Sequence, residues 1–268
     1  MLIAKKIVKF FLELSANILS KFKRIYFPHL YNWKMKLEFL FYHYEKDTVA
    51  LCKKVIKPGM NIIDVGAHIG YYSILFSNLI GKNGTVYAFE PEPKHFEFLK
   101  KNVQGYSNTK IILKAVSNKS SIVEFYVSKG KTGCDSLFPA DFREEKIRVN
   151  TITLDSFISE IGFPEINLVK IDIEGAEPYA IAGMKKLLNL NKDLMLIIEF
   201  CPKNLILAST EPIEFLKDLH QLGFNIYLVR EKGEIELLKQ NDIFQEISLI
   251  KQQKYYPKYY LVNLFCKK

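Results

Sequence analysis

The sequence is poor in the residues that mark metal-binding, disulfide-bonded and linker-rich proteins. It has four cysteines, Cys52, Cys134, Cys201 and Cys266, and no two of them form a Cys-x-x-Cys pair. This spacing disfavours a zinc ribbon, a thioredoxin-type redox site and a disulfide scaffold, and favours reduced thiols in an intracellular protein. With 13 glycines and 10 prolines, a collagen-like or linker-rich chain is excluded. No spacing of His and carboxylate residues requires a metal ion, so we expect none.

A long uncharged hydrophobic run is also missing. Lys9 and Glu13 interrupt the apolar stretch near the N-terminus, and no uncharged run approaches the ~18 residues of a membrane-spanning helix. A signal peptide is disfavoured because no small-residue cleavage site follows. The 268 residues, 49% hydrophobic and 25% charged, are typical of one large globular domain or of one domain with an appendage. We therefore expect a cytoplasmic protein.

Positive charge is gathered at the start of the chain. Residues 1–46 account for +6 of the net charge of +9, with nine Lys or Arg against three Glu. An enzyme that acts on nucleic acid would more often spread its basic residues around a groove. The distribution therefore predicts no nucleic-acid partner and indicates an anionic surface near the N-terminus.

Residues 3–25 predict an amphipathic helix, because apolar residues recur at steps of three and four while Lys9 and Glu13 lie on another face. The apolar positions are Ile3, Ile7, Phe10, Leu14, Ile18, Phe22 and Ile25. Aromatic residues are dense from Phe22 to Tyr44. In one interpretation the helix lies flat in anionic lipid, peripherally at the inner face of the membrane. In the other, it packs on the domain or on a partner subunit, and the aromatic residues cover an active site. The oligomeric state is not predicted.

From residue 47 onward, strand and helix patterns alternate. Helices are expected at 47–56, where Asp47 can cap the first turn, and at 71–80 and 93–103. Strands are expected at 60–65, 85–90, 110–116, 168–173, 194–200, 224–230 and 259–266. The pattern predicts an α/β, Rossmann-like, doubly wound seven-stranded sheet in residues 47–268, with residues 1–46 as a helical extension. Residues 117–154, with strands at 122–128 and 146–154, predict a hairpin-like insertion over the carboxyl edge of the sheet.

The sharpest local motif is the run DVGAHIG at 64–70, which follows a predicted strand and precedes a predicted helix. Gly66 permits a tight turn, Gly70 permits close approach of backbone, and the helix N-terminus favours an anionic group. Glu90 ends the next strand about 20 residues further on, where a carboxylate can accept hydrogen bonds from ribose hydroxyls. Together these features predict a cofactor that contains a nucleotide.

Electrostatics favours S-adenosylmethionine over NAD as that cofactor. The glycine pattern is GxxxG rather than GxGxxG, so the third glycine of a dinucleotide site is missing. Asp64 would repel a pyrophosphate, whereas it suits a ligand with an ammonium and a sulfonium group. Two alternatives stay open: an NAD-dependent oxidoreductase, and a catalytically silent adaptor that keeps the fold.

Four motifs, in this order, resemble those of FkbM-type methyltransferases. They read PGMNIIDVGAHIGYYS at 58–73, GTVYAFEP at 84–91, TITLD at 151–155 and LVKIDIEGAE at 168–177. The resemblance covers about residues 58 to 200, and His68 stands where the family often has Asn. It implies a class I S-adenosylmethionine-dependent methyltransferase, with the last strand antiparallel and usually with O-methylation. The expected acceptor is a hydroxyl on a sugar or glycan, a glycolipid or a secondary metabolite.

Carried over residue by residue, the resemblance places the methionine part of the cofactor near Asp64, the ribose at Glu90 and the adenine at the end of the third strand. The predicted cofactor-binding residues are Asp64, Gly66, Ala67, His68, Gly70, Tyr71, Glu90, Pro91, Ala115, Val116 and Asp172. Methyl transfer needs the acceptor oxygen in line with the S–CH₃ bond and a base for its proton. Asp172 is the first candidate for that base, and Glu174, Glu199 and His68 are the others.

Other residues are assigned more loosely. Lys170 and Glu177 are expected to pair with the candidate carboxylates and keep them ionised. Residues 134–136 are interpreted either as a lid that contacts substrate or as a plain turn. The remaining histidines, among them His95 and His220, show no ligand pattern and are taken as ordinary.

Overall fold

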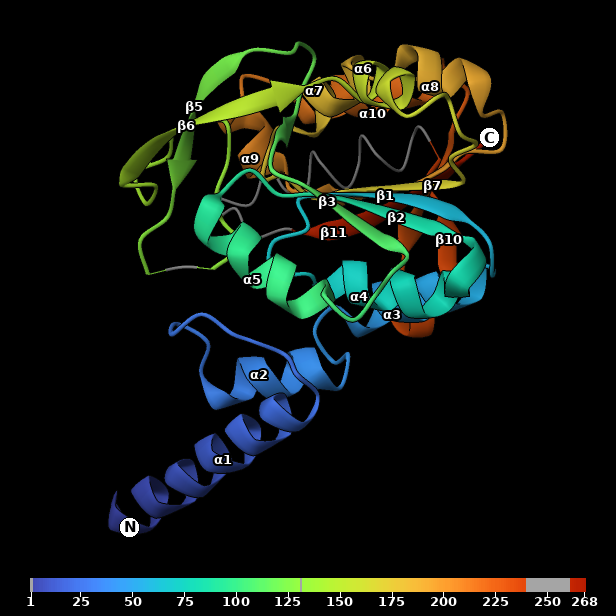
Figure 1. The fold of residues 1–268 in the computed structure, drawn as a ribbon. Helices are drawn as coiled ribbons and strands as arrows, with labels where there is room; N and C mark the ends of the chain where they lie inside the picture. Colours follow the sequence, from blue (N-terminus) through green and yellow to red (C-terminus); the bar gives the residue numbers. More distant parts are fainter. Residues whose placement is uncertain (1, 131, 240–260) are drawn as a thin grey trace.

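The computed structural model describes residues 2–130, 132–239 and 261–268, with only the helical backbone for residues 2–6 (Figure 1). In chain order, the strands of the main sheet are β1 (Asn61–Val65), β2 (Thr85–Phe89), β3 (Thr109–Ile112), β7 (Leu168–Ile171), β8 (Met195–Phe200), β9 (Asn225–Val229), β10 (Ile235–Leu237) and β11 (Val262–Lys267). Their spatial order is β10-β9-β11-β8-β7-β1-β2-β3. β11 lies between β8 and β9 and runs antiparallel to both, while β8, β7, β1, β2 and β3 are parallel. The predicted doubly wound sheet with an antiparallel last strand is confirmed.

The count of seven strands was too low for the described part of the chain, because β10 adds an eighth strand beside β9. β10 has only three residues, with Glu236 between two apolar ones. So short an edge strand leaves no hydrophobic run that a sequence pattern could detect. Residues 259–260, the start of the predicted last strand, lie outside the described residues.

Helices cover both faces of the main sheet (Figure 1). One face carries α3 (Lys46–Val55), α4 (Tyr71–Ile80) and α5 (Pro93–Val103), and the other carries α6 (Leu154–Glu160), α7 (Glu177–Ala182), α8 (Lys185–Leu190) and α10 (Pro212–Gln221). α9 (Pro202–Leu207) follows β8. Each face has its own apolar core, one including Phe76 and Leu99 and the other Phe157 and Phe215. Burial on both faces explains why the central strands read as continuous apolar runs.

The predicted third strand, 110–116, is wrong as a single element. It breaks after β3, and β4 (Ala115–Val116) joins a second sheet with β5 (Ile122–Val127) and β6 (Glu145–Ile152). β4 pairs parallel with β6, and β5 pairs antiparallel with β6, as the predicted hairpin requires. The apolar run continues through the break, so its pattern cannot show that the chain changes partner.

The N-terminal extension holds two helices, α1 (Leu2–Phe22) and α2 (Trp33–Leu40). α1 ends three residues earlier than predicted, at a turn in which Arg24 has φ 55°. α1 projects away from the rest of the molecule (Figure 1). No helix in the described part of the chain combines the length and apolarity needed to span a bilayer.

Asp47 does not cap α3 as predicted. The N-cap residue is Glu45, in a left-handed conformation with φ 46°. Asp47 lies in the first turn and accepts a hydrogen bond from Lys232 N at 2.8 Å. The side chain of Asp47 is therefore engaged with a distant turn and not with the amides of its own helix.

Candidate active site

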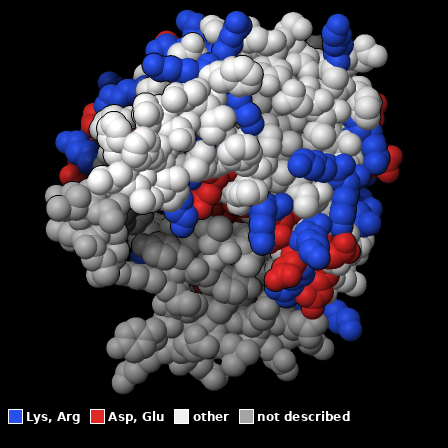
Figure 2. Space-filling model, turned by 90° about the horizontal axis from the view of Figure 1, so that it is seen from below, with Lys and Arg blue, Asp and Glu red and all other residues white. Residues whose placement is uncertain are grey.

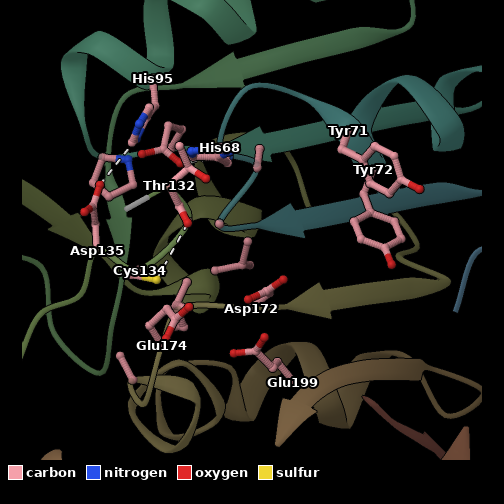
Figure 3. Close-up of a pocket in the computed structure, with 18 of the residues that line it drawn as sticks. His68, Tyr71, Tyr72, His95, Thr132, Cys134, Asp135, Asp172, Glu174 and Glu199 are labelled. Atoms are coloured by element: carbon pink, nitrogen blue, oxygen red, sulfur yellow. Dashed lines mark hydrogen bonds and ion pairs between the residues drawn. The ribbon is translucent and has the colours of Figure 1, made fainter. Parts of the chain in front are cut away.

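A cavity of about 630 Å³ opens at the carboxyl ends of β1, β2, β7 and β8. In open α/β sheets, ligands bind at this edge. Figure 3 shows its carboxylates Asp172, Glu174 and Glu199 opposite His68 and His95. Of the predicted site residues, those that line the cavity are Asp64, Gly66, Ala67, His68, Tyr71, Glu90, Pro91, Ala115, Val116, Asp172, Glu174 and Glu199. Residues as far apart in the sequence as Asp64 and Glu199 thus line the same cavity.

The turn after β1 leaves no room for a side chain at Gly66. Its φ is 85°, and a Cβ built there would lie 1.9 Å from the backbone oxygen of Asp172. The amides of Gly66 and Ala67 both donate to the Phe89 carbonyl oxygen, at 3.0 and 2.9 Å. These bonds hold the turn against the end of β2. His68 has φ 51°, in the left-handed region, where Asn and His are enriched among non-glycine residues.

Gly70 differs from the prediction, because it is not among the residues that line the cavity. It is the N-cap of α4 with φ 96°, and a Cβ there would approach Leu99 Cδ1 to 3.0 Å. Its place in the structure is therefore the close packing of α4 on α5. Of the two glycines of the GxxxG motif, Gly66 therefore lines the cavity and Gly70 packs in the core behind it.

Asp64 presents an unsatisfied oxygen to the cavity. Its side chain is fully buried; Oδ2 accepts from Ser73 Oγ at 2.6 Å, and Oδ1 has no hydrogen-bond partner among the described residues. Burial raises the pKa of Asp64, while Lys170 and Ser73 act in the opposite direction. A buried acceptor without a donor is costly. An ammonium group of a ligand would supply the missing donor.

Glu90 is held by backbone amides at the end of β2. Oε1 accepts from Glu92 N at 2.9 Å, and Oε2 accepts from His68 N at 2.8 Å. Each carboxylate oxygen keeps a second lone pair for a ligand hydroxyl. Burial raises the pKa of Glu90 to about 8, although the two amides favour the ionised form. Two neighbouring ribose hydroxyls fit such a carboxylate.

Lys170 and Asp172 form an ion pair at the end of β7. Lys170 Nζ donates to Asp172 Oδ2 at 2.7 Å, and the same ammonium lies 4.3 Å from the centroid of the Tyr72 ring. Burial acts to lower the pKa of Lys170, but nearby carboxylates, Asp172 first, outweigh it and raise that pKa. Lys170 therefore stays charged, and the predicted pairing of Lys170 with a candidate carboxylate is confirmed.

Glu174 and Glu199 are the more deeply buried acids beside this pair. Glu174 Oε2 accepts from Asn204 Nδ2 at 2.5 Å and lies 3.8 Å from Arg143 Nη2. Burial, followed by the charge of Asp172, raises the pKa of Glu174 to about 8 and that of Glu199 well above its ordinary value. Glu199 Oε2 has no hydrogen-bond partner among the described residues. A raised pKa favours the neutral acid, which can donate a hydrogen bond.

Glu177 has a different place from the one expected. It is not among the lining residues, and it accepts from the amides of Ile173 and Gly175 at about 3.0 Å. Burial raises its pKa to about 7. Glu177 thus fixes the turn between β7 and α7 rather than pairing with Asp172. Among the described residues, no group of three or more His, Cys, Asp or Glu is arranged to hold a metal ion.

His95, taken as ordinary from the sequence, lines the cavity. Its ring centroid is 4.1 Å from that of His68, and its Nδ1 lies 3.4 Å from Asp135 Oδ2 and 3.5 Å from Glu92 Oε2. Burial lowers the pKa of both imidazoles. One signal in the sequence could have found His95: it lies in the first turn of the helix after Glu90, at the edge where the cofactor was expected.

The N-terminal extension also reaches the cavity, which the motif comparison could not show. The residues concerned are Tyr31, Met35, Glu38, Phe39 and Tyr44. The Tyr31 hydroxyl lies 3.4 Å from His68 Nδ1, and the Tyr71 hydroxyl donates to the Tyr44 carbonyl oxygen. Aromatic residues of the extension thus line the cavity, as one of the two interpretations expected, but the apolar stripe of α1 is exposed and does not pack on the domain. From the insertion, Cys134 and Asp135 line the cavity, while Ser136 donates to the Glu174 carbonyl oxygen at 2.9 Å.

A comparison with models of protein families shows which family the chain belongs to. Residues 64–226, which begin at the cavity aspartate, match the methyltransferase FkbM domain. The chain belongs to this family.

Two curated relatives and one solved structure extend the match. The chain is 26% identical to 2-O-methyltransferase NoeI of Sinorhizobium fredii over 164 residues, which are 56% of this chain and 66% of NoeI. It is 28% identical to hexuronic acid methyltransferase AglP of Haloferax volcanii over 142 residues, 52% of this chain and 56% of AglP. Less than two thirds of each relative is therefore spanned. An inferred rRNA methylase of Clostridium thermocellum shares the fold, with a TM-score of 0.50 and 12% identity over 83% of this chain and 96% of that one.

Proposed function

We propose that this FkbM-family protein is an S-adenosylmethionine-dependent O-methyltransferase whose acceptor is a hydroxyl of a sugar or glycan. The observation that carries the proposal is the pairing, in one cavity, of a cofactor side with an acceptor side. Asp64 and Glu90 provide the first, and the Lys170–Asp172 ion pair with Glu174 and Glu199 provides the second. Membership in the FkbM family favours a methyl donor over NAD.

The cofactor side fits S-adenosylmethionine in chemistry. Asp64 Oδ1 would accept from its ammonium group, and Glu90 would accept from its ribose hydroxyls. Ala115 and Val116, both nearly fully buried, would edge the adenine. When bound, the cofactor supplies a methyl group on a sulfonium that is already a good leaving group. The chain itself must then orient the acceptor and take its proton.

Asp172 is the proposed proton acceptor. Lys170 keeps it in an ion pair at 2.7 Å, and its side chain is 24% exposed, so it is the most accessible of the three acids that line this side. Burial raises the pKa of Glu174 and of Glu199 and so favours their neutral form, which suits them to donate hydrogen bonds to other acceptor oxygens. His68, whose pKa is lowered well below its ordinary value by desolvation, is the alternative base.

The lining supports a polyhydroxylated acceptor. Tyr31, Phe39 and Tyr44 line the same cavity as the acidic groups, and a sugar presents both an apolar face and several hydroxyls. The name of AglP includes a hexuronic acid, and that of NoeI a 2-O position. We infer an acceptor from the same broad class, either free or in a glycan, and no nucleic-acid substrate.

The remaining assignments are proposals too. Residues 1–46 form an extension to a catalytic domain at 47–268. Residues 3–25 associate peripherally with the inner face of a membrane, which the apolar side chains exposed on α1 support.

Titration calorimetry with S-adenosylhomocysteine and with NAD tests the cofactor assignment. Binding of the first without the second supports the proposal, and the reverse result would restore the oxidoreductase alternative. Transfer of a labelled methyl group into a fractionated lysate then tests catalysis. Cofactor binding without any labelled fraction would favour the silent adaptor.

A further inference from the structure

α1 is docked with its polar side inward. Glu13 accepts from Trp33 N and Lys36 Nζ, both at 2.9 Å, and Asn17 accepts from Lys36 Nζ at 2.8 Å. Ser20, 8% exposed, lies one turn further on. A helix on a globular protein normally turns its apolar stripe toward the core. Here hydrogen bonds and an ion pair fix the polar stripe against α2, so the apolar stripe is left on the outside.

The outward apolar face of α1 is large and nearly continuous. It consists of Ile7, Val8, Phe10, Phe11, Leu14, Ile18 and Phe22, which are between 44% and 85% exposed. Helical spacing places most of these side chains on one stripe. An apolar patch of this kind on a soluble surface marks an interaction site.

Charge distinguishes between the partners that could cover this face. Lys9, Lys21 and Arg24 are exposed on or just after the helix, and Glu13, the acidic residue of its described part, is turned toward α2. Figure 2, seen from the side on which α1 projects, shows a broad face without charged residues bordered by Lys and Arg. Basic residues beside an apolar stripe complement anionic lipid head groups, and a second copy of this basic surface would repel the first.

α1 is connected to the cavity through α2. Lys36 of α2 joins Glu13 of α1, and the neighbouring α2 residues Met35, Glu38 and Phe39 line the cavity. A surface that binds α1 would therefore lie close to the mouth of the cavity.

We propose that the outward face of α1 docks on a bilayer that contains anionic lipid, and that the acceptor hydroxyl is carried on a lipid-anchored head group that enters the cavity beside α2. This inference rests on the proposed function. It narrows the acceptor to one presented at a membrane surface.

The test is co-sedimentation of the full chain with vesicles of phosphatidylcholine, with and without phosphatidylglycerol. The double variant Phe10→Ser/Phe11→Ser removes two side chains that are 64% and 59% exposed. The matched control, Leu190→Ser/Ile206→Ser, removes two that are 60% and 46% exposed on other helices. We expect the α1 variant to lose on the order of tenfold in partition to anionic vesicles, and the control to bind like the wild type.

Several results would overturn the docking proposal. They are equal pelleting of both variants, wild-type protein that does not pellet with anionic vesicles, and self-association that Phe10→Ser/Phe11→Ser abolishes. Binding of S-adenosylhomocysteine is measured on the same samples, since its absence would refute the proposed function while leaving vesicle docking intact. Labelled methyl groups that enter the chloroform–methanol extract of a lysate support a lipid-anchored acceptor. Label confined to water-soluble molecules refutes it.

Discussion

Lys170 lies directly opposite Asp64 in the β1–β7 register, and its ammonium donates to Asp172, the residue that directly follows β7. The three residues alternate along neighbouring parallel strands, so their side chains share one side of the sheet. One buried cation thus stands between the aspartate assigned to the cofactor and the aspartate assigned to the acceptor. The charge of Lys170 therefore acts on both the cofactor side and the acceptor side of the cavity.

Asp172→Asn should abolish the proton acceptor while keeping the cofactor side intact. We expect turnover to fall at least about 100-fold, the scale of a lost general base, with the affinity for S-adenosylhomocysteine within about threefold. Single-turnover methyl transfer and calorimetry measure the two quantities. Asp193→Asn, on an exposed aspartate, is the control. Undiminished turnover in Asp172→Asn would shift the role to His68 or to one of the glutamates.

Lys170→Met tests whether the cation positions that base. Without the ion pair at 2.7 Å, Asp172 should be held less firmly toward the acceptor, so turnover should fall while the affinity for S-adenosylhomocysteine is retained. A lysine needed only for folding would lower turnover and cofactor affinity together. Lys82→Met, on an exposed lysine, is the control, and thermal unfolding of each variant shows whether the loss of the buried pair has affected folding.

Glu90→Ala should weaken cofactor binding by about 2 kcal/mol, the scale of lost hydrogen bonds to a charged group. That corresponds to roughly 30-fold in Kd. Calorimetry with S-adenosylhomocysteine is the measurement, and Glu97→Ala, on the exposed side of α5, is the comparison. Unchanged affinity would show that the ribose lies elsewhere.

The affinity for the cofactor should rise with pH. Burial raises the pKa of Glu90 to about 8, so the free protein holds a neutral acid there at pH 6. Ribose hydroxyls donate to the ionised form, so binding below pH 8 releases a proton and is opposed by acid. We expect the affinity for S-adenosylhomocysteine to increase from pH 6 to about 8 and then to level off. Calorimetry in buffers of different ionisation enthalpy counts the released proton, and a flat profile for the wild type would contradict the assignment.

The parts of the site that could be predicted from the sequence are local. The glycine turn and Glu90 each follow a buried strand, so one short window shows both the chemistry and the place. The contacts of His95 with Asp135 and of Tyr31 with His68 join residues that are 40 and 37 positions apart. They depend on how an insertion and an extension pack on the sheet. The sequence also cannot show that β4 leaves the main sheet for the second sheet, since both sheets bury apolar side chains.

The conformation of His68 gives a last prediction, about stability. Its φ of 51° lies in the left-handed region, where β-branched residues are strained and Asn is tolerated. His68→Asn should therefore fold with a free energy of unfolding close to that of the wild type, while His68→Val should lose about 1–2 kcal/mol or more. Chemical denaturation of both variants measures the difference. Since each variant removes the same imidazole and its contact with His95, an equal loss in both would assign the cost to that contact and not to the backbone.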